Sequence, residues 1–142
     1  MILVDTSGLV AALFPDQQDH AACARVLLES EGPFVLSPFV LAEIDYLVTK
    51  FAGTKIEVEL LKEVASGAYM LADFHPSDID EAVSVIRRYD DLDIGLADAS
   101  LVVLSRRHDT RKVLTLDERH FRTLRAAHGK PFRVLPADDY AD

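Results

Sequence analysis

The chain begins with ILVDTSGLVAAL (residues 2–13), in which a short aliphatic run passes directly into a helical pattern. Ile2–Val4 is too short for a helix and is typical of a buried strand, whereas Thr6–Leu13 predicts a helix. Asp5 stands at the junction, at the carboxyl end of the predicted strand. The same order of strand and helix recurs along the chain.

Short aliphatic or β-branched runs alternate with helical patterns from one end of the chain to the other. This alternation predicts an α/β protein with a mainly parallel sheet covered by helices on both faces, and such sheets bind ligands at the carboxyl ends of their strands. The five predicted strands are Ile2–Val4, Phe34–Leu36, Tyr69–Leu71, Val113–Leu116 and Phe132–Leu135. The predicted helices are Thr6–Leu13, Gln18–Ser30, Pro38–Phe51, Lys55–Ala65, Asp78–Tyr89 and Ala97–His108, with a short turn at Glu118–Arg125.

Local signals mark several of the predicted helix ends. Ser37 followed by Pro38 is a favourable N-cap and first-turn pair. Gly53 stands where a helix is expected to end, and Ser77 is a candidate cap for the helix expected to begin at Asp78.

The composition predicts one compact domain that spans residues 1–142. The hydrophobic content of 49% suffices for one well-buried core in a chain of 142 residues. Cys23 is the one cysteine, which excludes an internal disulfide and Cys-rich zinc sites. The N-terminal apolar run lacks Lys and Arg and is broken by Asp5, and no apolar stretch approaches the ~20 residues that span a bilayer, so we expect a cytoplasmic protein.

The charge is distributed unevenly along the chain. The net charge of −9 argues against a nucleic-acid-binding protein, because phosphate contacts require Lys and Arg. Residues 105–133, however, hold nine basic residues against three acids, a local charge of +6 that leaves −15 on the rest. A basic docking face beside an acidic metal site and an ordinary solvated surface both fit this distribution.

Two acids follow predicted strands directly. Asp5 comes after Ile2–Val4, and Asp117 comes after Val113–Leu116. Each is a candidate metal ligand at the carboxyl edge of the sheet. Each could equally cap the helix that follows, because Asp is a favoured N-cap residue.

Two further acids are expected within apolar helices. Glu43 lies three residues after Val40 and four before Leu47, within an apolar stripe, and Asp98 is the one charged residue between Ile94 and Leu104. Burying an unpaired charge is costly, so each acid should be paired, protonated or bound to a metal. A structural salt bridge remains the alternative role for each.

Four carboxylates in one place would favour a hard cation such as Mg²⁺, or Mn²⁺, over other cofactors. One or two such ions activate water and stabilise a phosphodiester during in-line displacement, so the residue types indicate phosphoryl chemistry. The motifs of serine hydrolases, P-loop proteins, dinucleotide-binding proteins and zinc proteases are absent from the sequence. The five histidines show no metal-ligand spacing and are expected to be surface or capping residues, with His120 and His128 also candidate phosphate contacts.

With these acids in place, the chain resembles the PIN-domain nucleases, and among them the VapC-type toxins of bacterial toxin–antitoxin systems. The resemblance spans nearly the whole chain, in order and spacing. Four segments carry it: Val4-Asp5-Thr6-Ser7, Leu41-Ala42-Glu43-Ile44, Leu96-Ala97-Asp98-Ala99, and Thr115-Leu116-Asp117-Glu118-Arg119-His120-Phe121.

The resemblance implies a three-layer α/β/α fold and Mg²⁺- or Mn²⁺-dependent endoribonuclease activity. It also implies a homodimer and a cognate antitoxin that covers the site. Asp93, five residues before Asp98, is interpreted first as a helix-start residue and second as an extra acid. The family's acidic positions match Asp5, Glu43, Asp98 and Asp117, and its small hydroxyl positions, which orient ligands or water, match Thr6, Ser7 and Thr115.

Three alternative functions stay open at this stage. A PIN nuclease of RNA processing would have the same acids without an antitoxin. A receiver-like or haloacid-dehalogenase-like domain would form an aspartyl phosphate, but it needs a second acid where Ser7 stands and a lysine after a late strand, whereas Lys130 precedes the last one. A non-catalytic binding module would not need all four acids.

Overall fold

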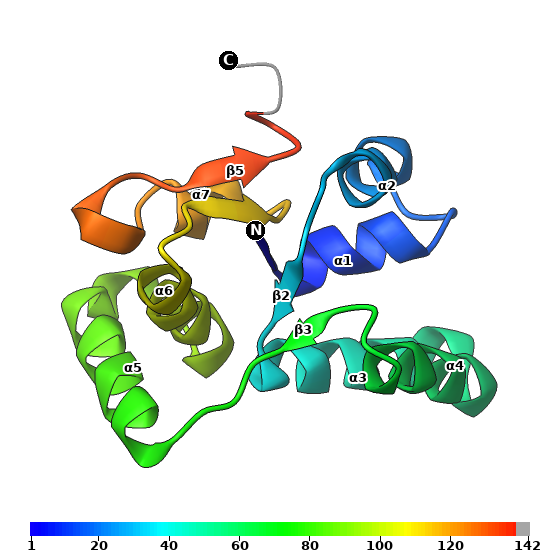
Figure 1. The fold of residues 1–142 in the computed structure, drawn as a ribbon, viewed down its shortest axis with the longest axis horizontal. Helices are drawn as coiled ribbons and strands as arrows, with labels where there is room; N and C mark the ends of the chain where they lie inside the picture. The colour runs from blue at the N-terminus through cyan, green and yellow to red at the C-terminus, as the bar shows by residue number, and fades with distance from the viewer. Residues whose placement is uncertain (139–142) are drawn as a thin grey trace.

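Five parallel strands form one sheet at the centre of the protein (Figure 1), in a computed structural model that describes residues 1–138. Residues 139–142, the last of the predicted domain, lie outside the described residues. The strand order is β3-β2-β1-β4-β5, so the first strand is the central one. The strands are β1 (Ile2–Val4), β2 (Phe34–Leu36), β3 (Met70–Leu71), β4 (Lys112–Leu114) and β5 (Arg133–Leu135).

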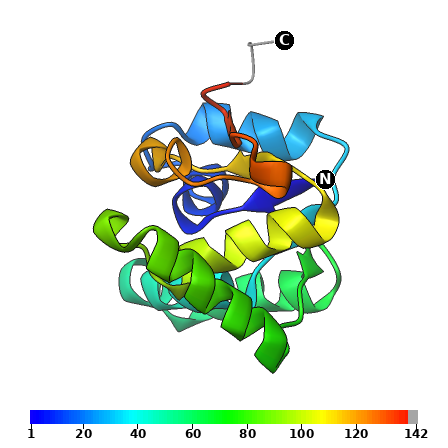
Figure 2. The same ribbon diagram turned by 90° about the vertical axis from the view of Figure 1, so that its left-hand side faces the viewer.

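Helices cover both faces of this sheet, as the alternating pattern predicts. Figures 1 and 2 show α1 to α4 on one side of the sheet and α5 to α7 on the other. Right-handed crossovers produce this arrangement, because strands β2 and β3 are added on one side of β1 and strands β4 and β5 on the other. The helices are α1 (Thr6–Leu13), α2 (His20–Glu29), α3 (Pro38–Ala52), α4 (Thr54–Ala65), α5 (Pro76–Arg88), α6 (Leu96–His108) and α7 (Glu118–Phe121), with single 3₁₀ turns at η1 (Asp90–Leu92) and η2 (Ala127–Gly129).

The core lies on both faces of β1, β2 and β4. Leu3 pairs in register with Val35 and Val113, and all three are fully buried. Strands buried on both faces read as continuous apolar runs, which explains why these segments stand out in the sequence. The central position of β1 places its carboxyl end between those of β2 and β4, at the point where the strand order reverses. Open α/β sheets bind their ligands at such a point.

The predicted helix ends are confirmed at two places and wrong at a third. The Ser37 hydroxyl accepts a hydrogen bond from the Phe39 amide at 3.2 Å, and Gly53, at φ 87°, separates α3 from α4. Ser77 is not a cap, because α5 begins at Pro76 and therefore already includes Ser77. The N-cap of α5 is His75. The carboxylate of Asp78 accepts a hydrogen bond from the His75 amide at 2.9 Å, which supplies the capping interaction from inside the helix.

Within residues 1–138, no helix combines the length and the apolar character that a bilayer span needs.

Candidate active site

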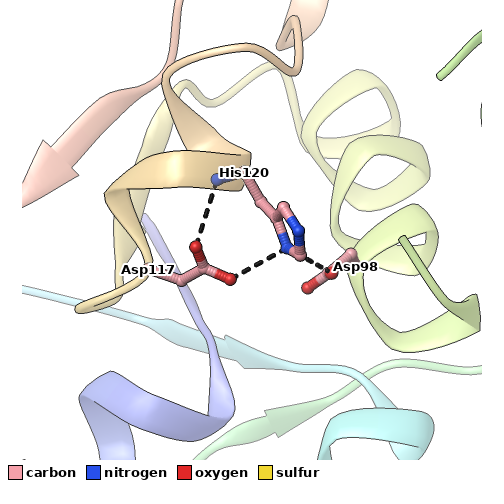
Figure 3. A group of neighbouring side chains, drawn as sticks. All are labelled: Asp98, Asp117 and His120. Carbon is pink, nitrogen blue, oxygen red and sulfur yellow. Dashed lines mark hydrogen bonds and ion pairs between the residues drawn. The ribbon is translucent and has the colours of Figure 1, made fainter. Parts of the chain in front are cut away.

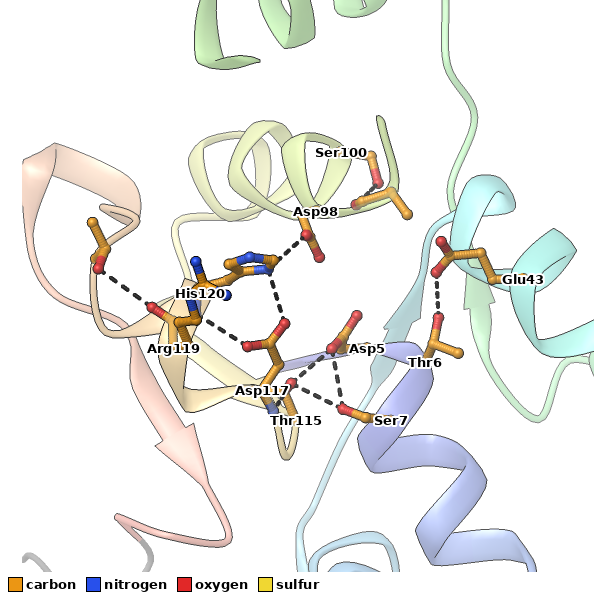
Figure 4. Close-up of polar contacts among 12 residues, drawn as sticks. Asp5, Thr6, Ser7, Glu43, Asp98, Ser100, Thr115, Asp117, Arg119 and His120 are labelled. Carbon is orange, nitrogen blue, oxygen red and sulfur yellow. Dashed lines mark hydrogen bonds and ion pairs between the residues drawn. The ribbon is translucent and has the colours of Figure 1, made fainter. Parts of the chain in front are cut away.

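The four predicted acids gather at the carboxyl edge of the sheet (Figure 4), each from a different element. Asp5 directly follows β1, and Asp117 comes three residues after the end of β4. Glu43 lies in the second turn of α3, the helix that follows β2, and Asp98 lies in the first turn of α6. The parallel sheet therefore brings together residues that are as much as 112 positions apart in the sequence.

Asp5 is the most deeply buried of these acids, with 5% of its surface exposed. Its Oδ2 accepts hydrogen bonds from Thr115 at 2.7 Å and Ser7 at 3.3 Å. Although Asp5 occupies the N-cap position of α1, its side chain makes no capping hydrogen bond. Burial raises the pKa of the Asp5 carboxyl, and so do the nearby charges of Asp117 and Glu43, while the Thr115 hydrogen bond lowers it.

Thr115 connects Asp5 to Asp117. Its hydroxyl donates to Asp5 and accepts from the backbone amide of Asp117 at 3.0 Å. The Ser7 hydroxyl lies 3.2 Å from that of Thr115 and accepts from the Leu116 amide at 3.0 Å, so the loops after β1 and β4 are joined at two points. These hydroxyls therefore hold the orientation of two carboxylates.

Gly8 permits this close approach of the two loops. A Cβ at this position would overlap the backbone carbonyl and side chain of Leu114, the last residue of β4. A glycine here therefore lets α1 pack against the end of β4, so that Ser7 and Thr115 come within hydrogen-bond distance.

Asp117 caps a helix and also faces the other acids. Its Oδ1 accepts a hydrogen bond from the His120 amide at 3.1 Å and caps α7. Its Oδ2 faces into the site, 2.9 Å from the Nδ1 atom of the His120 ring. The cap fixes one oxygen of the carboxylate and leaves the other directed toward Asp98.

Asp98 and His120 meet across the site, as Figure 3 shows. The Asp98 side chain is 18% exposed, and its Oδ2 lies 3.1 Å from the same Nδ1 atom. Neither carboxylate contact has hydrogen-bond geometry at the buried Nδ1. Burial and then the charge of Asp5 raise the pKa of Asp98 from 3.8 to about 6, whereas His120 lowers it.

Sequence reasoning missed the position of His120. It was expected to be a surface residue, a cap or a phosphate contact, yet its half-buried ring lies between two of the acids. One available signal was its spacing, because a residue three positions after an N-cap lies one turn above it on the same helix face.

The expected burial of Glu43 is wrong. The fully buried row of α3 is Val40, Ile44 and Val48, spaced by four residues. Glu43 is exposed and belongs to the neighbouring row with Leu47 and Phe51, which is itself partly exposed. The prediction merged these two rows into one stripe, although only one of them faces the core.

Glu43 is nevertheless tied to the other acids. Its Oε1 accepts a hydrogen bond from Thr6 at 2.7 Å, and Thr6 is adjacent to Asp5 in the chain. Its charge also contributes to the raised pKa values of Asp5 and Asp98. Glu43 therefore lies at the open edge of the acidic cluster, in electrostatic contact with the buried members.

Asp93 is not part of this cluster. It is exposed and follows η1 in the left-handed region, at φ 58°. The helix begins only at Leu96, with Gly95 as its N-cap, so the interpretation of Asp93 as a helix-start residue is wrong. A residue in the left-handed conformation ends a turn instead of starting a helix.

The chemistry of the donor set fits a divalent cation. One ligand atom each from Asp98, Asp117 and His120 lies within 4.8 Å of the others, and the charge of Asp5, which Thr115 holds by a hydrogen bond, acts on Asp98 from nearby. Burial and the charges of the neighbouring acids raise the pKa of Asp98, and a bound cation would offset the repulsion between these charges. Oxygen donors of this kind suit Mg²⁺ or Mn²⁺.

The raised pKa of Asp98 predicts that Asp98→Asn stabilises the metal-free protein. An ionised Asp98 destabilises the folded state at pH values above its folded pKa of about 6, and this cost declines as the pH falls from 6 and is lost below 3.8, where the carboxyl is neutral in both states. In excess EDTA at pH 8, we expect the melting temperature to rise by about 5 °C. Thermal unfolding at pH 8, 6 and 4.5 measures the effect.

Asp93→Asn is the matched control, because it removes the same charge from an exposed position nearby. Its melting temperature should stay within about 1 °C of the parent. A large loss of stability in Asp98→Asn at pH 8 would instead assign Asp98 to a structural ion pair with His120.

Comparisons with known proteins agree with this geometry. The model of the family described as PIN domain matches residues 2–126. The protein named Ribonuclease VapC26, from Mycobacterium tuberculosis, is 42% identical over 135 residues, which are 95% of this chain and 100% of that protein.

Two solved structures share the fold. One, described as the crystal structure of Mycobacterium tuberculosis VapC20, a Sarcin-Ricin loop cleaving toxin, has a TM-score of 0.74 and 21% identity, over 82% of this chain and 90% of that one. The other, a toxin–antitoxin complex from Klebsiella pneumoniae, has a TM-score of 0.65 and 16% identity, over 87% and 92%. The family match, the extent of the similarity to Ribonuclease VapC26 and the shared fold together show that this chain belongs to the PIN domain family.

Proposed function

We propose that this protein is a Mg²⁺-dependent endoribonuclease and the toxin of a type II toxin–antitoxin system. The observation that carries the proposal is the convergence of Asp5, Asp98 and Asp117, with Glu43 at their edge, at the carboxyl end of the central strands. The name of the 42% identical relative, Ribonuclease VapC26, supports RNA as the substrate. The receiver-like and dehalogenase-like alternatives have no such support.

The cation would be held by the carboxylates of Asp5, Glu43, Asp98 and Asp117. When bound, Mg²⁺ supplies positive charge that offsets these acids and activates water for attack on a phosphodiester. We favour Mg²⁺ over Mn²⁺ because four carboxylates form an all-oxygen donor set, although the His120 nitrogen would be accepted more readily by Mn²⁺.

The protein's own contribution is to hold these groups in place before the substrate arrives. Thr115 and Ser7 fix the Asp5 carboxylate, and the α7 cap fixes Asp117. Thr6 orients Glu43 from the opposite side of the opening. Because each carboxylate is held by a different loop or helix, little rearrangement is needed when a charged substrate binds, which lowers the barrier of the reaction.

A protein antitoxin and a second copy of the chain are the proposed protein partners. A cavity of about 510 Å³ lies beside Glu43 and is lined by Thr6, Ala42, Tyr46 and Leu47. Tyr46 is 66% exposed and Phe51 is 47% exposed on the same helix. Exposed aromatic groups are typical of interaction surfaces, so an antitoxin that covered this groove would also cover the opening of the site.

We further propose that residues 1–142 act as one domain in the cytoplasm.

Induced expression of the protein without an antitoxin should arrest growth of a bacterial host within a few generations. Sequencing of RNA 5′ ends before and after induction should show new ends at a small set of positions, because an endonuclease cuts internally. The Asp93→Asn variant, altered outside the acidic cluster, should arrest growth equally well.

Growth arrest without new RNA ends would contradict the proposed activity. RNA cleavage without growth arrest would favour the alternative of an RNA-processing PIN nuclease. A gene for a DNA-binding protein directly upstream, whose product relieves the arrest, would support the antitoxin assignment.

A further inference from the structure

A second cavity lies at the opposite edge of the sheet from the acids. It has a volume of about 600 Å³ and lies where β1, β4 and β5 begin. Basic side chains dominate its lining, which includes Arg111, Lys112, Lys130 and Arg133 together with His128 and Asp109. None of these residues belongs to the acidic cluster.

The lysines of this cavity lack acidic partners in the described part of the chain. Among residues 1–138, Asp109 is the one acidic residue in the lining, and its carboxylate already contacts the His128 Nε2 at 2.8 Å. Among residues 1–138, no acidic side chain pairs with Lys112 or Lys130. The guanidinium of Arg111 is oriented by a hydrogen bond to the Pro131 carbonyl at 3.2 Å. A concave site with free lysines and a fixed arginine favours an anion.

The chain itself connects this cavity to the acidic site. Because β4 and β5 are parallel, the segment between them must return from the carboxyl edge of the sheet to the amino edge. That segment begins at Asp117 and reaches the cavity at Lys130. Arg119 is exposed along it, whereas Arg122 is paired with Glu118 and Asp138. Strands of three residues separate the two edges by roughly 10 Å, which a few nucleotides of an extended RNA strand can span.

We propose that this basic cavity binds backbone phosphates of the RNA substrate several nucleotides away from the scissile bond. The inference rests on the proposed ribonuclease function. The chain outside residues 105–133 carries a net charge of −15, so RNA that reaches the acids is repelled elsewhere and is attracted along this one segment. An acidic peptide would suit the cavity's charge, but nothing links such a peptide to the acidic site.

Binding of single-stranded RNA of two lengths tests the proposal. Fluorescein-labelled RNAs of 2 and 24 nucleotides are titrated with protein carrying Asp5→Asn to prevent cleavage, in Mg²⁺ and at several KCl concentrations; the dinucleotide has only the scissile phosphate and cannot reach the cavity. Lys112→Gln/Lys130→Gln should weaken binding of the longer RNA about tenfold at low salt and reduce the slope of log K against log[salt] by about 1.4. Binding of the shorter RNA should be unchanged.

Two controls isolate the position of the charges. Lys55→Gln/Lys62→Gln removes the same charge from exposed positions on α4, outside the cavity, and should leave both affinities unchanged. Lys112→Arg/Lys130→Arg keeps the charge and should retain tight binding of the longer RNA.

The proposal would be overturned if Lys112→Gln/Lys130→Gln and Lys55→Gln/Lys62→Gln weakened binding of the longer RNA equally. It would also be overturned if Lys112→Gln/Lys130→Gln left that binding unchanged. The proposal would also be overturned if Lys112→Gln/Lys130→Gln weakened binding of a hexaglutamate peptide but left RNA binding intact. Cleavage of both RNAs by the active protein, with and without the cavity substitutions, is measured in parallel. If the active protein cannot cut RNA at all, the proposed function fails. If it cuts RNA but the cavity substitutions affect the two RNA lengths equally, only this inference is overturned.

Discussion

Removal of divalent cations should lower the rate of RNA cleavage by at least about 10³-fold. Among residues 1–138, no Lys or Arg forms an ion pair with Asp5, Asp98 or Asp117, and the pKa of Asp98 is already raised by burial and by its neighbours. Without a cation, the cluster therefore repels a phosphodiester and offers no strong electrophile. The measurement is initial cleavage of a labelled RNA in excess EDTA, followed by addition of Mg²⁺ or Mn²⁺.

The control for this experiment is the Asp5→Asn protein, purified by the same procedure. Any cleavage that persists in EDTA and occurs equally in this variant comes from a contaminating nuclease. Cleavage in EDTA by the parent alone would rule out the metal-dependent mechanism. Recovery with Mn²⁺ but not with Mg²⁺ would correct the identity of the cation and would point to His120 as a ligand.

Asp5→Asn should reduce cleavage by about 10³-fold or more while the fold is kept. Asn has nearly the same shape and can still accept the hydrogen bond from Thr115, but it lacks the negative charge. Because burial raises the pKa of Asp5, removal of its charge should not destabilise the metal-free protein. Cleavage rates and melting temperatures of the same preparations separate these two effects, and in cells the variant should no longer arrest growth.

A graded series shows whether the acids act as one unit. Thr115→Val removes the hydroxyl that orients Asp5 and should cost about 10- to 100-fold, because it disturbs a carboxylate without removing it. Asp5→Asn/Asp98→Asn should be little slower than either single variant. Full activity in Asp5→Asn would show that Asp5 has only a structural role, and multiplicative losses would show that the two acids serve separate steps.

Most of the secondary structure follows from local signals in the sequence. The predicted strands Ile2–Val4 and Phe34–Leu36 and the predicted helix Thr6–Leu13 have the same bounds in the structure. The ends of other elements differ by one to four residues, for instance α2, which begins at His20 after the left-handed Asp19. Helix ends depend on the backbone conformation of single residues, which periodicity does not report.

Burial was harder to predict than element type. The apolar pattern around Asp98 correctly indicates a buried helix, since residues 99–105 are all buried. Glu43 also lies among apolar residues, in a segment that includes Asp45 and Lys50, yet its side chain is exposed. Two rows of apolar residues run along α3, and the packing of neighbouring helices decides which row faces the core.

The sequence by itself determined the α/β architecture, the resemblance to the PIN domain and the identity of the four acids, because these depend on local periodicity and on residue type. Only the tertiary structure decided that Thr115 joins Asp5 to Asp117, that His120 lies between Asp98 and Asp117, and that basic residues at the starts of β4 and β5 share one cavity. These distances depend on strand register and helix packing between segments far apart in the chain. Such long-range contacts leave no periodic trace in the sequence of either segment.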